Sequence, residues 1–117
     1  CQCTVEDQTV QVVFPPMDLA LSAACAERVG VTCRIEDYPA VRRGWDHFLA
    51  DLDEFKPDAL VLNSTTATLA GDLETCRLAK EKFPNILTMA KGETLVVNAI
   101  TVLRDHPELD IVLPNEG

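Results

Sequence analysis

Four short polar side chains in a row are the residues of this chain best suited to bind a ligand. They are Asn63, Ser64, Thr65 and Thr66, and the apolar run 59–62 comes directly before them. Hydroxyl and amide groups donate and accept hydrogen bonds, and in an open parallel sheet ligands bind where a strand passes into the next helix. The row therefore predicts a site for a polar or phosphorylated ligand at that corner. One of the four is also expected to cap the helix that follows.

The elements that position this row alternate between strand and helix patterns along the chain. Runs of β-branched and apolar residues predict strands at 9–14, 31–36, 58–62, 85–89 and 109–113. Apolar residues at helical spacing predict helices at 17–29, 44–55, 68–83 and 93–105. Strands that are joined through helices pair in parallel, with right-handed crossovers. We therefore expect an α/β domain built as a three-layer, doubly wound, parallel five-stranded sheet.

The carboxyl ends of parallel strands share one edge of a sheet, so several loops are expected to meet there. Pro16 and Met17 follow the first strand, and Lys91 and Gly92 follow the fourth. Together with the polar row after the third strand, these loops flank the expected switch in strand order. The edge offers hydrogen-bonding groups, one lysine and one glycine that lets the backbone approach a ligand closely.

Neither histidine is expected at that edge. His47 lies within the predicted helix 44–55, where we expect it on the surface, and His106 follows the helix 93–105, where we expect it to cap the carboxyl end. The phosphate-loop, dinucleotide-binding and nucleophile-elbow motifs are missing from the sequence. We therefore expect no catalytic residue in this domain.

Size and charge exclude two classes of partner. The chain has 117 residues, a net charge of −9 and a pI near 4.5, which fits one domain whose electrostatic field repels nucleic acid. No apolar run approaches the ~20 residues of a membrane helix, and residues 1–8 do not resemble a signal peptide. We expect a cytoplasmic protein in which 1–8 are disordered or extended and 9–117 form the α/β domain. The missing initiator Met, and the missing helix after the fifth strand, indicate a fragment of a larger chain.

The five cysteines are an odd number without paired spacing, which argues against a disulfide framework. We expect Cys25, Cys33 and Cys76 to be small buried side chains, because each has apolar neighbours in a predicted helix or strand. Cys1 and Cys3 form a two-ligand pattern without a nearby histidine, which is a weak signal for a metal site. A reducing compartment fits this cysteine usage best.

Three stretches of sequence, taken in order, are similar to a known family. The first, 15–37, runs Pro-Pro, helix, Gly30, strand and Asp37. The second, 55–84, runs Phe-Lys-Pro-Asp, strand, the polar row, helix and Lys-Phe-Pro. The third, 107–117, runs from Pro-Glu-Leu-Asp to Asn-Glu-Gly. Across residues 9–117 the chain resembles the N-terminal cobalamin-binding domain of radical S-adenosylmethionine enzymes.

This resemblance implies a flavodoxin-like, Rossmann-like fold with strand order 2-1-3-4-5. It also implies that the nucleotide tail of cobalamin enters the edge between strands one, three and four. The residues expected around the tail are Pro16, Met17, Asn63, Ser64, Thr65, Thr66 and Gly92. The module would position the corrin for a downstream catalytic domain of the same chain, and the cofactor would carry the chemistry. The iron–sulfur cluster and S-adenosylmethionine would belong to that domain, because the C-x-x-x-C-x-x-C motif is absent here.

The chain departs from the family pattern at three places. Ala90 and Lys91 stand where the family has Gly-Gly, with Gly92 one place later, and Asn63 stands where the family has Ser. The D-x-H-x-x-G motif is also absent, so no lower-axial histidine is supplied. These departures support an alternative, a degenerate Rossmann-like interaction domain that has lost cofactor binding. A third interpretation is a small-molecule-binding lobe from a larger sensor.

Overall fold

The computed structural model describes residues 16–38 and 43–113. Within these ranges the chain forms four helices and three strands. In chain order they are α1 (Met17–Glu27), α2 (Trp45–Phe55), β1 (Ala59–Asn63), α3 (Leu69–Lys82), β2 (Leu87–Lys91), α4 (Glu93–Asp105) and β3 (Ile111–Leu113). The alternation of strand and helix from β1 to β3 confirms the α/β class.

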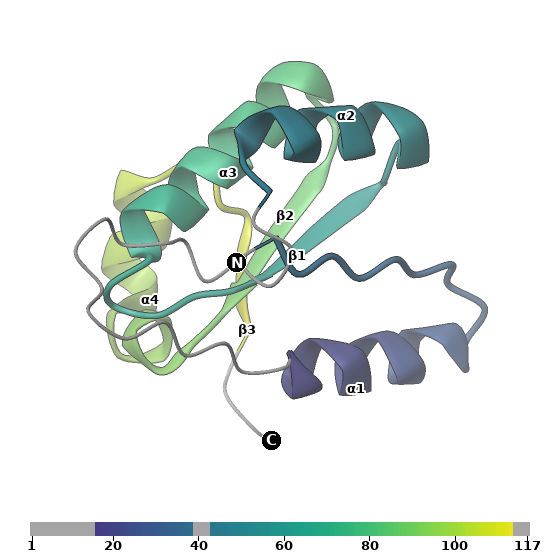
Figure 1. Ribbon diagram of the computed structural model, residues 1–117. Helices are drawn as coiled ribbons and strands as arrows, with labels where there is room; N and C mark the ends of the chain where they lie inside the picture. The colour runs from purple at the N-terminus through teal and green to yellow at the C-terminus, as the bar shows by residue number, and fades with distance from the viewer. Residues whose placement is uncertain (1–15, 39–42, 114–117) are drawn as a thin grey trace, which may run out of the picture.

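The strands form one parallel sheet in the order β1-β2-β3 (Figure 1). Ala59 pairs with Leu87 at one end of β1 and Asn63 pairs with Lys91 at the other, while Met89 pairs with Ile111. The five-stranded sheet with order 2-1-3-4-5 is therefore wrong, since the described sheet has three strands. These three correspond to the strands expected at 58–62, 85–89 and 109–113.

Two of the expected strands are not among the three that the structure describes, for different reasons. The strand expected at 9–14 lies outside the described residues. The segment 31–36 has no strand assigned to it and leads from α1 toward α2 as a coil (Figure 1). Its alternating pattern is that of an extended chain, but ladder hydrogen bonds also require a neighbouring strand, which alternation does not specify. Side-chain contacts attach it instead, because Arg34 pairs with Asp51 of α2 at 3.2 Å.

The core has two parts, and α3 contributes to both. One part lies between α3, α4 and the sheet and contains Leu62, Leu73, Cys76, Ala90, Leu95, Val102 and Leu109. The other lies under α2 and contains Phe48, Leu52, Ala79 and Ile86. Burial of these apolar side chains is the main source of stability for a domain of this size.

One carboxylate joins three elements at the amino end of β3. Asp110 Oδ2 accepts a hydrogen bond from Lys80 Nζ of α3 at 2.7 Å and from the backbone N–H of Thr88 in β2 at 2.9 Å. Partial burial opposes ionisation of Asp110, but these donors outweigh it and lower the pKa of the carboxyl group. β3 begins at Ile111, two residues later than the expected strand, although the Asp110 backbone N–H already donates to the Thr88 carbonyl oxygen at 3.1 Å.

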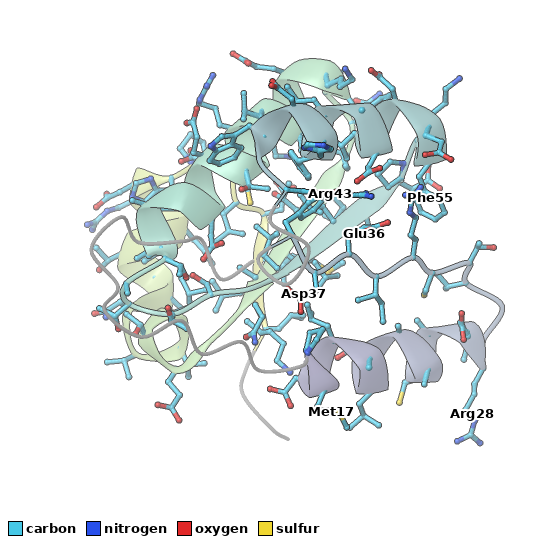
Figure 2. The ribbon with its side chains drawn as sticks, viewed as in Figure 1. Met17, Arg28, Glu36, Asp37, Arg43 and Phe55 are labelled. Carbon is cyan, nitrogen blue, oxygen red and sulfur yellow. The ribbon has the colours of Figure 1, made fainter. Side chains whose placement is uncertain are left out.

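α1 lies across the sheet from α2 and α3 (Figure 1), and part of its exposed surface is apolar. Met17 and Arg28 mark its two ends in Figure 2, and Phe55 ends α2 on the other side. All of α1 lies within the described residues, and none of its side chains is buried. Leu21 is 68% exposed and Val29, just beyond the helix, is 80% exposed.

The burial expected for the cysteines is correct for one of the three. Cys76 is buried on α3, Cys33 is half-buried, and Cys25 is exposed on α1 because that helix buries no face. Burial, together with the charge of Asp72, raises the pKa of the Cys76 thiol to about 12. Cys1 and Cys3 lie outside the described residues. Among the helices described, none combines the length and apolar character that crossing a membrane requires.

Candidate functional site

The carboxyl edge of the sheet brings the loop after β1 against the start of α4. Asn63 and Lys91 are the last paired residues of β1 and β2. The backbone N–H of Ser64 then donates to the carbonyl oxygen of Lys91 at 2.8 Å, which extends the pairing by one step. Beyond it, the hydroxyls of Thr66 and Thr94 are hydrogen-bonded to each other. The polar row after β1 is therefore brought together with Gly92, as the sequence predicted.

Gly92 makes the close approach of these two segments possible. It is buried and has φ +155°, and a Cβ built on it would lie 2.1 Å from the carbonyl oxygen of Ser64. Any side chain at this position would collide with backbone. Gly92 therefore allows α4 to pack against the loop. The role expected from the sequence was different, namely a close approach of the backbone to a ligand.

Ser64 points into the molecule as well. It is 4% exposed, and it lies close enough to Asp72 of α3 to affect that carboxyl group. Burial raises the pKa of Asp72, while the hydroxyls of Thr68 and Ser64 oppose the rise. Ser64 thus belongs to a buried polar cluster under the edge, and it offers no group to a ligand outside.

Thr65 and Thr66 are the exposed members of the row. Thr65 is held from below by Thr68, whose Oγ1 accepts a hydrogen bond from the Thr65 backbone N–H at 3.0 Å. Thr68 Oγ1 in turn donates to Asp72 Oδ2 at 2.7 Å. Sequence reasoning missed both Thr68 and Asp72, although the spacing of four residues between a hydroxyl and a carboxylate on one helix is a readable signal.

The expectation that one of the four row residues caps the next helix is wrong. α3 has Thr68 as its N-cap residue and no side-chain hydrogen bond of the capping type. The reason is that the hydroxyl of Thr68, which could cap the helix, is turned inward to Asp72 and to the Thr65 backbone. The first turn of α3 therefore holds the loop in place through its inner face.

The start of α1 reaches the same edge. Asp18 Oδ2 lies 4.0 Å from Nζ of Lys91, whose side chain is 14% exposed. Pro16 is half-buried and Met17 is exposed, and Asn63 is half-buried at the end of β1. The described structure therefore gathers all the predicted site residues near one edge, but it exposes only Met17, Thr65 and Thr66 of them.

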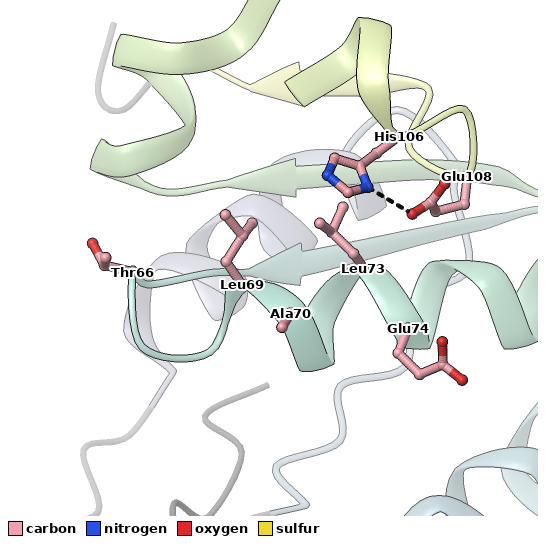
Figure 3. Close-up of a pocket in the computed structure, with 7 residues that line it drawn as sticks. All are labelled: Thr66, Leu69, Ala70, Leu73, Glu74, His106 and Glu108. Carbon is pink, nitrogen blue, oxygen red and sulfur yellow. Dashed lines mark hydrogen bonds and ion pairs between the residues drawn. The ribbon is translucent and has the colours of Figure 1, made fainter. Parts of the chain in front are cut away.

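An open groove of about 480 Å³ leaves this edge at Thr66 and runs along α3 (Figure 3). Its other lining residues are Leu69, Ala70, Leu73, Glu74, His106 and Glu108. His106 is the C-cap residue of α4, as predicted, and its Nδ1 lies 3.1 Å from Glu108 Oε1. Glu74 is held by Arg77, whose Nε lies 2.7 Å from Oε2. No local pattern predicts this groove, since its two walls come from segments more than thirty positions apart.

The chemistry of the edge fits a polar cofactor tail only in part. The exposed hydroxyls of Thr65 and Thr66, and the backbone N–H groups of Glu93 and Thr94 ahead of the first helical donors of α4, suit a polar or phosphorylated group. Within 16–38 and 43–113, no three His, Cys, Asp or Glu side chains gather as a metal site. No family model, curated protein or solved structure matches this chain. Similarity to the cobalamin-binding domains therefore rests on the sequence motifs alone.

Proposed function

We propose that this chain is a cobalamin-binding module that holds the nucleotide tail of the cofactor at the carboxyl edge of β1 and β2. The observation that supports the proposal is the exposed hydroxyl pair of Thr65 and Thr66, set beside the amino end of α4 on a hydrogen-bonded loop. The positive end of the helix dipole favours a phosphate at that point. Bound cobalamin would supply the methyl-transfer or radical chemistry for a separate catalytic domain.

In this proposal the residues at the edge have two separate roles. Thr65, Thr66 and Met17 contact the ligand, because they are the exposed ones. Ser64 and Gly92 form the buried contact that fixes the loop against α4. The described edge residues include no histidine. This part of the chain would therefore place and orient the cofactor without supplying a histidine ligand to its metal.

A visible-absorption titration with hydroxocobalamin, followed by desalting, tests this function. The unmodified chain should retain about one equivalent with a perturbed corrin spectrum. Thr65→Val combined with Thr66→Val removes two hydroxyls and keeps side-chain shape, so affinity should fall at least ~10-fold. Thr101→Val is the matched control, since Thr101 is an exposed threonine farther along α4. Equal retention by all three proteins would contradict the site, and no retention by the unmodified chain would contradict the function.

A second candidate function is an interaction domain without a cofactor, and one observation favours it. Leu21, Val29, Val31 and Ile35 expose apolar surface along α1 and the segment after it. Exposed apolar patches of this kind mark protein contacts. In sedimentation velocity, the unmodified chain should then associate as concentration rises, and Leu21→Glu should weaken the association. A chain that stays monomeric at every concentration, with or without the substitution, would argue against self-association through α1.

A further inference from the structure

A chain of three hydrogen-bonding groups runs from the core to the exposed edge. Asp72 and Thr68 are 2% and 6% exposed on the inner face of the first turns of α3, and Thr65 is exposed above them. Thr68 Oγ1 lies 2.7 Å from Asp72 Oδ2 and 3.0 Å from Thr65 Oγ1. The same oxygen accepts the Thr65 backbone N–H at 3.0 Å. The exposed hydroxyl is therefore connected to a buried carboxylate through one intermediate hydroxyl.

The positions of the protons along this chain follow from what each group can do. A carboxylate only accepts, and a threonine hydroxyl has one proton to donate. Thr68 has two acceptors within reach, Asp72 Oδ2 at 2.7 Å and the Thr65 carbonyl oxygen at 3.4 Å, and the closer acceptor makes the stronger hydrogen bond. Its proton therefore lies toward Asp72, and its lone pairs face Thr65.

With the proton of Thr68 committed inward, the contact between the two hydroxyls has one direction. Thr65 Oγ1 must donate its proton to Thr68 Oγ1, since the latter has none left for it. The oxygen of Thr65 then presents only lone pairs to whatever binds at the edge. The neighbouring hydroxyls of Thr66 and Thr94 differ, because either can be the donor and the other keeps a proton for a ligand.

We propose that Asp72 and Thr68 are positioning residues that fix the Thr65 hydroxyl as a hydrogen-bond acceptor, so that it selects an N–H or O–H donor on the ligand. A primary amide or a sugar hydroxyl pairs with Thr65, whereas a phosphate oxygen faces it lone pair to lone pair. Phosphate belongs instead at the Thr66–Thr94 pair and the amino end of α4. This inference rests on the proposed function in using the same edge as the site, and it assigns the orientation of the ligand there.

Two small probes, acetamide and inorganic phosphate, test this division in the full chain by NMR titration of backbone amides. Acetamide carries the N–H donors that Thr65 should accept, and phosphate at neutral pH is mainly an acceptor. Acetamide should shift the signals of Thr65, and phosphate should shift those of Thr66 and Thr94. At Thr65 the apparent Kd for phosphate should exceed that for acetamide by about tenfold, which corresponds to ~1.4 kcal/mol. Phosphate shifting Thr65 as strongly as acetamide would overturn the inference.

Two variants separate positioning from general damage. Thr68→Val removes the inward acceptor and frees the Thr65 proton, so phosphate should gain affinity at Thr65 while acetamide loses it. Thr65→Val should abolish the acetamide response and leave the phosphate response at Thr66 and Thr94 unchanged, and it decides the matter if Thr68→Val does not fold. A Thr65→Val protein that still responds to acetamide at position 65 would overturn the proposal.

The probe titration tests the acceptor role of Thr65, and the hydroxocobalamin titration tests the proposed function. Either can fail without the other. If the chain shows this probe pattern but does not retain hydroxocobalamin, the acceptor role of Thr65 is supported and cobalamin binding is contradicted. A chain that retains hydroxocobalamin but lacks the pattern keeps the function and loses the acceptor role.

Discussion

α1 and α3 have similar lengths and both carry regularly spaced apolar residues, yet they are used in opposite ways. α3 buries five residues, one of which, Asp72, belongs to the polar cluster under the edge. α1 buries none. α3 is joined directly to β1 and β2, which pair with each other, so its neighbours are guaranteed by short connections. The difference teaches that apolar spacing predicts a helix, whereas the neighbouring strands decide whether that helix has something to cover.

The largest effect on stability should come from Leu95 of α4, which lies in the core part between α3, α4 and the sheet. Leu95 is 1% exposed, so Leu95→Ala should lower the free energy of unfolding by about 2–5 kcal/mol through lost burial and a cavity. Leu21→Ala on α1 should change it by less than ~0.5 kcal/mol. Urea denaturation of both variants measures the contrast. Similar losses of unfolding free energy in the two variants would show that α1 is covered in solution and that α1 and α3 contribute alike to stability.

Gly92 allows a test of how closely the loop after β1 packs against α4. Gly92→Ala forces a Cβ onto the Ser64 carbonyl and should destabilise the chain by about 1–3 kcal/mol. Gly44→Ala is the control, because nothing lies within 4 Å of the added Cβ and its φ is −106°. Thermal unfolding should separate the two variants clearly. A Gly92→Ala protein as stable as the Gly44→Ala protein would mean that the loop and α4 pack less closely than described.

Asp110 gives the contact between α3 and β2 a dependence on pH. Asp110→Asn should cost about 1–2 kcal/mol at neutral pH, because the ion pair with Lys80 is lost. The folded-state pKa of Asp110 is lowered, so its stabilisation is present above the unfolded pKa and disappears as the pH falls through the folded value. The gap between the two proteins in urea midpoint should therefore close on acidification. Asp105→Asn, at an exposed pair with Arg104, should show no such gap.

The smallest expected effect is a difference in thiol reactivity between one cysteine on α1 and one cysteine on α3. Cys25 on α1 is exposed, and Cys76 on α3 is buried with a thiol pKa of about 12. A brief alkylation at pH 8, read by peptide mass spectrometry, should modify Cys25 and spare Cys76. In urea both should react. Early modification of Cys76 would show that the α3 core opens readily.

The sequence predicted the central part of the fold well because its patterns were local. The run 58–62 became β1 one residue later, and 68–83 became α3 with one residue fewer at each end. The segment 31–36 failed because alternation specifies an extended chain but not the partner that would hydrogen-bond to it. At the site, the row was correctly placed at the edge. Which members face outward was not predictable, since the inward turn of Ser64 depends on Gly92, which lies 28 positions away.

The contacts of Asp110 also bear on the order in which the chain assembles. They join residues 22 and 30 positions apart, whereas the hydrogen bond between Thr68 and Asp72 spans four. Contacts that close long loops tend to form late, after local helices and adjacent strands are in place. We therefore expect the attachment of β3 to follow the transition state for folding. Loss of the carboxylate would then speed unfolding and leave the folding rate nearly unchanged.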